Sequence, residues 1–129
     1  EVGVRKEITV TADPALLLEG APLSREVLRR EGLAGRRRLV GVSVREPGMA
    51  APDIEESHYH ALLANAADYM VERFDADLVF VPMEPRIMDT QHCHAVIARM
   101  ANPRRARVLL GDYTPEQLLT LCPCPTPAR

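Results

Sequence analysis

The chain has 129 residues, of which 47% are hydrophobic and 26% charged, and its formal net charge is −2 at pH 7. The apolar content excludes general disorder, and the small negative charge gives no basis for nucleic-acid binding. No apolar run approaches the ~20 residues that cross a bilayer and no signal peptide opens the chain, so we expect a cytoplasmic protein without a transmembrane segment.

Strand and helix patterns alternate from the beginning of the chain. Residues 7–11 are β-rich and predict a first strand, and Ser24 is placed to cap a short helix behind it. The valine-rich run from Leu39 to Val44 predicts a strand that a parallel sheet buries on both faces.

The clearest helix pattern follows Asp53. We expect Asp53 to be the N-cap, with Glu56 three residues later completing a capping box. The apolar residues that recur at helical spacing and predict the buried face are Tyr59, Leu62, Leu63, Ala66, Met70, Val71 and Phe74.

The same alternation continues to the end of the chain. Residues 77–81 predict a third strand and residues 90–100 a third helix, on which Cys93 and Val96 share an apolar face. Residues 107–110 predict a fourth strand. A fourth helix is expected from Thr114, because Pro115 fits the first helical position and Gln117 completes a capping box.

Strands separated by helices imply right-handed crossovers and a parallel sheet. We therefore predict an α/β domain with a doubly wound, Rossmann-like, mostly parallel sheet of about four strands and helices on both faces. The domain is expected to span residues 1–121. The Pro-rich residues 122–129 are expected to form a disordered tail.

Ligands of open parallel sheets bind beyond the carboxyl ends of the strands. Polar and charged residues follow the predicted strands at this edge, and we take five as candidate substrate-binding residues: Arg45, Glu84, Arg86, Asp89 and His92. With an arginine directly at a strand end, the set favours an anionic small molecule over merely solvated loops. Dinucleotide and P-loop fingerprints are excluded, because the loop after residue 45 has a single glycine, Gly48.

The histidines form two pairs, His58 with His60 and His92 with His94. Both pairs fall in predicted helices, where residues two apart point about 200° from each other, so neither pair can hold one ion and no metal is expected. The chain has three cysteines, an odd number that argues against a disulfide framework. Cys93 is interpreted as a buried thiol.

Six of the sixteen positive charges lie between Arg25 and Arg38. A solvated helix face and turn is the simplest interpretation of this cluster. The alternative is a surface that meets a phospholipid-linked or otherwise anionic substrate.

Four motifs occur in order along the chain, and their order and spacing extend over nearly all of residues 1–121. They are T-A-D-P-A-L-L-L at 11–18, V-G-V-S-V-R at 40–45, L-V-F-V-P-M-E followed by Asp89 at 78–89, and V-L-L-G-D-Y-T-P-E-Q-L-L at 108–119. In this arrangement the sequence resembles the C-terminal half of the polysaccharide pyruvyl transferase family. The resemblance implies part of the second lobe of a two-lobed GT-B-like fold.

The resemblance also implies a reaction. Family members transfer a pyruvyl group from phosphoenolpyruvate to a cell-wall saccharide, which can be lipid-linked, and form a cyclic ketal; the donor is a substrate and no cofactor is implied. Arg45 matches a donor-binding arginine of the family, Asp89 matches an aspartate at the site edge, and Asp13 matches a structural Asp-Pro turn.

The chain departs from the family pattern in two respects. It has no Arg-Leu-His motif after the fourth predicted helix, and Glu84 stands where many members have glutamine. We therefore expect a portion of an enzyme that is inactive alone. The alternatives are a GT-B glycosyltransferase lobe that binds a nucleotide sugar, and a non-catalytic α/β binding module.

Overall fold

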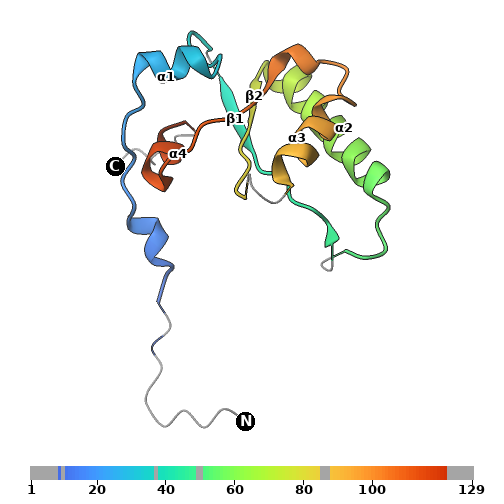
Figure 1. Cartoon of the computed structure of the whole chain (residues 1–129), viewed down its shortest axis with the longest axis horizontal. Helices are drawn as coiled ribbons and strands as arrows, with labels where there is room; N and C mark the ends of the chain where they lie inside the picture. Colours follow the sequence, from blue (N-terminus) through green and yellow to red (C-terminus); the bar gives the residue numbers. More distant parts are fainter. Residues whose placement is uncertain (1–8, 10, 37, 49–50, 85–87, 122–129) are drawn as a thin grey trace.

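The computed structural model describes residues 9, 11–36, 38–48, 51–84 and 88–121 (Figure 1). The elements, in chain order, are the 3₁₀ helix η1 (Pro14–Leu17), α1 (Arg25–Arg30), β1 (Leu39–Val42), α2 (Glu56–Phe74), β2 (Asp77–Phe80), α3 (Asp89–Ile97), the 3₁₀ helix η3 (Pro103–Arg105), β3 (Ala106–Val108) and α4 (Pro115–Leu121).

The strands form one parallel sheet in the order β1-β2-β3. Leu39 of β1 is paired with Asp77 of β2, and Leu78 of β2 with Ala106 of β3. The sheet has three strands within the described ranges, whereas about four were expected. The first predicted strand, 7–11, falls mainly outside those ranges, and neither Thr9 nor Thr11 lies in a strand.

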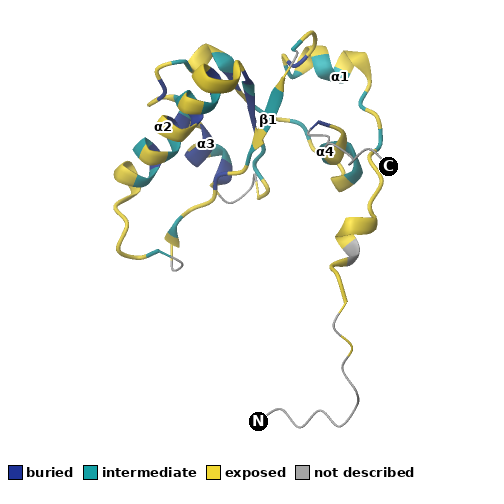
Figure 2. Cartoon of the chain, turned by 180° about the vertical axis from the view of Figure 1, so that it is seen from behind, coloured by how far each residue is buried: buried dark blue, intermediate teal, exposed yellow. Residues whose placement is uncertain are grey.

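The central strand β2 divides the interior into two cores. Leu78 and Phe80 point toward α2 and α3, and Val79 points to the opposite face, where Leu33, Leu109 and Leu121 pack; all three β2 side chains are 0% exposed. Adjacent strand residues face opposite sides of a sheet, so an uninterrupted apolar run requires cover on both sides. The buried residues accordingly run along the strands between the helices (Figure 2).

The strand order explains which helices share a face. The strands follow one another in space as they do in sequence, so both right-handed crossovers place their helices, α2 and α3, on the same face. Helix α1 precedes β1 in the chain and α4 follows β3, and both lie on the other side of the strands (Figure 1). This confirms a Rossmann-like α/β arrangement with helices on both faces.

One carboxylate fastens the amino edge of the sheet. Asp77, the first residue of β2, forms ion pairs with Arg36, which precedes β1, and with Arg105, which precedes β3. The Arg105 Nε atom is 2.7 Å from the carboxylate, and its Nη2 atom is 2.9 Å from the carboxylate of Asp75. Two arginines of the cluster at residues 25–38 therefore have structural contacts at this edge. Arg36 pairs with Asp77, and Arg38 donates to the carbonyl oxygen of Phe74.

Local capping signals at two helices are confirmed. The Ser24 hydroxyl accepts a hydrogen bond from the Val27 amide at the start of α1. At α4, the Thr114 amide donates to the Gln117 side chain and the Gln117 amide to the Thr114 hydroxyl, so the expected capping box forms.

One expectation for α2 is wrong and a second is confirmed only in part. The N-cap is Glu55, whose carboxylate accepts from the amides of Ser57 and His58, and not Asp53. The predicted buried face is confirmed in part, since Val71 is buried and Tyr59, Leu63 and Met70 pack against the core. It is rotated from the prediction, because Leu62 is 51% and Phe74 47% exposed. The buried residues of α2 are His60, Ala64, Ala67 and Val71. Small alanines let the helix backbone approach the sheet, and this close packing outweighs the burial of the larger side chains.

Within the described ranges, no helix is both long enough and apolar enough to cross a membrane.

The orientation of α2 can be tested with a pair of substitutions. Ala64→Leu should destabilise the fold by about 1–3 kcal/mol, because the added methylenes enter a packed core. Leu62→Ala should change the free energy of unfolding by about 0.5 kcal/mol or less, as is usual at the surface. Urea unfolding followed by circular dichroism measures both. A larger loss of stability in Leu62→Ala than in Ala64→Leu would show that Leu62, as predicted from the sequence, faces the core.

Candidate functional site

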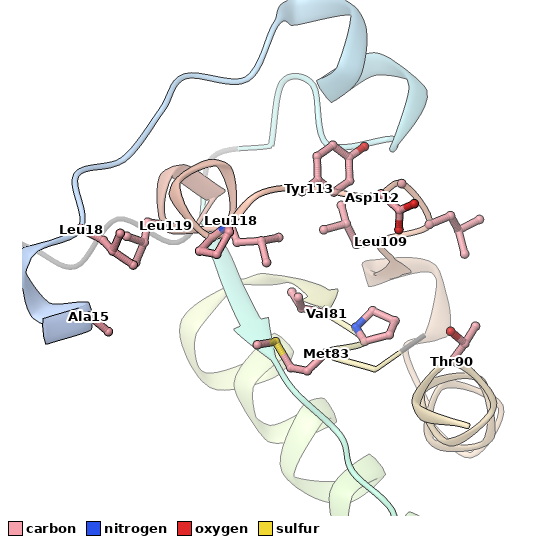
Figure 3. Close-up of a pocket in the computed structure, with 14 residues that line it drawn as sticks. Ala15, Leu18, Val81, Met83, Thr90, Leu109, Asp112, Tyr113, Leu118 and Leu119 are labelled. Carbon is pink, nitrogen blue, oxygen red and sulfur yellow. The ribbon is translucent and has the colours of Figure 1, made fainter. Parts of the chain in front are cut away.

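A groove of about 590 Å³ lies where β2 and β3 end, on the α4 side of the sheet (Figure 3). Val81, Pro82 and Met83 follow β2 and form one part of its wall, and α4 forms another. The remaining lining residues are Ala15, Leu18, Thr90, Leu109, Leu110, Gly111, Asp112 and Tyr113. The lining is largely apolar, and Asp112 is its one charged member among the described residues.

The wall of the groove after β3 is held by the carboxylate of Glu31, the C-cap residue of α1. Glu31 accepts from the Tyr113 hydroxyl at 2.6 Å and from the Leu110 amide at 3.1 Å. Arg30 donates to the same hydroxyl at 3.1 Å. Burial and the hydrogen bond to Glu31 raise the pKa of Tyr113, so its hydroxyl stays protonated as the donor.

Gly111 allows Tyr113 to fold back over this wall. A Cβ atom added at Gly111 would lie 2.6 Å from Cζ of the Tyr113 ring, far inside van der Waals contact. The glycine is therefore needed for close approach of a side chain to the backbone.

The wall after β2 is held by Asp89. Its Oδ2 atom accepts from the amides of Met83, at 3.1 Å, and Glu84, at 2.9 Å. The carboxylate also lies in the first turn of α3, where the helix dipole favours negative charge. Although only 6% exposed, Asp89 thus has two amide donors, and it positions the loop.

The structure separates the five sequence candidates. Arg45 and Glu84 are exposed, while Asp89 and His92 are buried. Arg86 lies outside the described residues. None of the other four lines the groove, although Glu84 and Asp89 belong to the loop that shapes it.

His92 meets a residue that the sequence analysis did not connect to it. Its Nδ1 atom lies 2.8 Å from Nε2 of His60, and both histidines are 3% exposed. The two members of each sequence pair do not meet, since His58 and His94 are exposed. Instead, His60 of the first pair meets His92 of the second pair between α2 and α3. Glu56, four residues before His60, joins this cluster. The i, i+4 spacing was visible in the sequence, whereas the partner from the other helix was not.

The electrostatics of this region are those of a buried apolar face. Burial, followed by the positive charge that His92 can carry, lowers the pKa of His60, so its neutral form is favoured. Cys93 is 0% exposed, which confirms it as a buried thiol, and burial raises its pKa to about 11. Cys122 and Cys124 lie outside the described residues.

Comparisons of the chain with protein-family models, with curated proteins and with solved structures find no match. The likeness to pyruvyl transferases therefore rests on the sequence motifs.

Replacing Asp89 should loosen the loop after β2. Asp89→Ala leaves the amides of Met83 and Glu84 without their acceptor and should cost about 1–3 kcal/mol in the free energy of unfolding. Asp89→Asn keeps one acceptor oxygen and should cost less. Amide hydrogen exchange would report faster exchange at these two positions in the alanine variant. Unchanged protection would show that Asp89 does not hold the loop.

His60 should make stability depend on pH. Its folded pKa is lowered from 6.5, so the unfolded chain takes up the proton first and stability falls as the pH drops below 6.5. Urea unfolding in EDTA at about pH 7.5 and about pH 5.5 should show this loss, and His60→Gln should reduce it. The exposed neighbour provides the control, since His58→Gln should leave the loss intact. An equal effect of both variants would assign the pH dependence elsewhere.

Proposed function

We propose that this chain is the substrate-holding portion of a polysaccharide pyruvyl transferase. In this proposal it binds phosphoenolpyruvate and a cell-wall saccharide at the carboxyl edge of its sheet. The observation that carries the proposal is the groove at that edge, between the strand-end loops and α4. Parallel α/β sheets bind small molecules in this position, and the order of the four sequence motifs selects the family.

The composition of the groove suggests that the donor and the saccharide bind at different positions. The donor carries a carboxylate and a phosphate, which require cations, but the described lining residues supply the acidic Asp112 and no cation. The groove is therefore better suited to the saccharide, whose hydroxyls can donate to Asp112 and whose ring can stack on Tyr113. We assign the anionic donor to the exposed Arg45, which lies in the segment that follows β1.

Two walls of the groove rest on preorganised backbone. Glu31 fixes the loop that carries Asp112 and Tyr113, and Asp89 fixes the loop after β2. Since each loop is held by a buried carboxylate, the side chains that meet the ligands need not be ordered on binding, which reduces the entropic cost of association.

The same groove supports a second candidate, a glycosyltransferase lobe that binds a nucleotide sugar. An apolar slot with one carboxylate suits a nucleobase and the hydroxyls of a ribose. The two functions predict that ligands contact different residues, Arg45 for phosphoenolpyruvate and the groove for a nucleotide sugar. Mapping the contacted residues therefore distinguishes them.

A backbone NMR titration tests the proposal. Phosphoenolpyruvate should shift the signals of Arg45 and of residues 83–84 and 88–89, and the shifts should disappear in the Arg45→Ala variant. The exposed Arg29, on α1, gives the matched control, because Arg29→Ala should leave the shifts unchanged.

The competing outcomes are distinct. Shifts of Val81 and residues 111–113 caused by a UDP-sugar, with none caused by phosphoenolpyruvate, would favour the glycosyltransferase lobe. The absence of shifts with both ligands would favour a non-catalytic binding module.

A further inference from the structure

The first turns of α2 and α3 bring three metal-ligating side chains together. Glu56 and His60 are four residues apart on α2 and so share one side of the helix, and His92 projects from α3. One donor atom from each of the three residues lies within 4.8 Å of the others. The closest pair is Nε2 of His60 and Nδ1 of His92, at 2.8 Å.

The burial of the two imidazoles needs a physical explanation. Polar side chains that are 97% removed from solvent normally satisfy their hydrogen-bonding atoms. Here the second ring nitrogen of His92, Nε2, is fully buried and has no hydrogen-bond partner among the described residues. An ion bound at Nδ1 of His92 would leave Nε2 without a partner as well, so the desolvation penalty of that atom does not itself indicate a metal. The case for a site is the convergence of three donor side chains from two helices.

We propose that Glu56, His60 and His92 form a binding site for a divalent transition-metal ion, of which Zn²⁺ fits best. Two imidazole nitrogens and one carboxylate are a donor set that Zn²⁺ prefers, and three protein ligands leave a fourth position open. The exposed side chain of Glu56 provides the route of entry from solvent. The proposal does not depend on pyruvyl transfer.

The geometry requires a small adjustment to accept the ion. Zinc–nitrogen bonds of about 2.05 Å at a tetrahedral angle place two ligand nitrogens about 3.3 Å apart, so the rings must separate by about half an ångström. His60 is already favoured in its neutral form, the form that ligates. When the ion binds, the proton that lies between the two nitrogens in the metal-free chain would move to the other ring nitrogen of the histidine that carries it, so that both imidazoles ligate in the neutral form.

Charge explains why the carboxylate is needed. The N-termini of α2 and α3 both present partial positive charge, which disfavours a cation. Glu56 lies in the first turn of α2 and offsets this charge. Both helices begin after strands end, so the open fourth position lies at the carboxyl edge of the sheet, where an oxygen of a bound substrate could occupy it.

The test uses a Cys122→Ser/Cys124→Ser background, so that these thiols do not bind added metal. After treatment with a chelator, titration calorimetry with Zn²⁺ should show one ion bound per chain. Addition of Co²⁺ should produce the visible absorption of a four-coordinate site. Glu56→Gln, His60→Asn and His92→Asn should each weaken Zn²⁺ binding at least about tenfold, the loss that removal of even an outer-shell partner typically causes.

The exposed histidines next to the site provide matched controls. His58→Ala and His94→Ala should leave the Zn²⁺ affinity within about twofold of the parent. Circular dichroism checks the fold of each variant. Glu56→Gln replaces an exposed side chain on a well-formed helix, so it keeps the test valid if a histidine variant unfolds.

Three results would overturn the proposal. They are an unchanged Zn²⁺ affinity in folded Glu56→Gln, an equal loss of affinity in the His58→Ala or His94→Ala control, and the absence of four-coordinate Co²⁺ bands. Each would leave His60 and His92 as a hydrogen-bonded pair of the core.

Discussion

The burial of β2 on both faces is the constraint on which the rest of the structure depends. Leu78, Val79 and Phe80 are all fully removed from solvent, so the strand can carry no polar side chain along its middle. Its backbone hydrogen bonds must go to strands on both sides, and its side chains need helices above and below. Polar chemistry is therefore confined to the two ends of the strand.

The two ends of β2 have different tasks. At the amino end, Asp77 pairs with Arg36 and Arg105 and fixes the positions at which the neighbouring strands begin. At the carboxyl end, the chain turns at Pro82 into the loop that Asp89 holds. The groove and the histidine cluster both lie at this end, on opposite faces of the sheet. The fold thus brings a groove and a buried histidine cluster to a single edge.

Elements whose signals are local could be predicted from the sequence. The caps at Ser24 and Thr114 depend on hydrogen bonds spanning three residues, and both helices begin where these residues indicate. The orientation of α2 could be predicted only in part, since Val71 and Leu63 of the predicted face meet the core but Leu62 and Phe74 do not. Leu62 and Phe74 are large and apolar, but the sheet selects the side with Ala64 and Ala67, because the depth of packing depends on the opposing surface.

The candidate sites show the same division. That residues after parallel strands meet at one edge follows from the strand pattern, since parallel strands end together. The pairing of His60 with His92, 32 residues apart, depends on how two helices cross and has no local signature. Likewise, Glu31 reaches Tyr113 from 82 positions earlier in the chain. The residues that organise the groove are thus the ones that sequence spacing could not connect.

The ion pairs of Asp77 have a consequence for how this domain could change over time. Because the strands are aligned at their amino ends, the register of the sheet does not depend on the length or composition of the loops at the opposite edge. Insertions and exchanges in those loops can therefore accumulate without misaligning the sheet. Exposed loop positions such as Glu46 and Leu110 are therefore free to vary, whereas Arg36, Asp77 and Arg105 constrain one another.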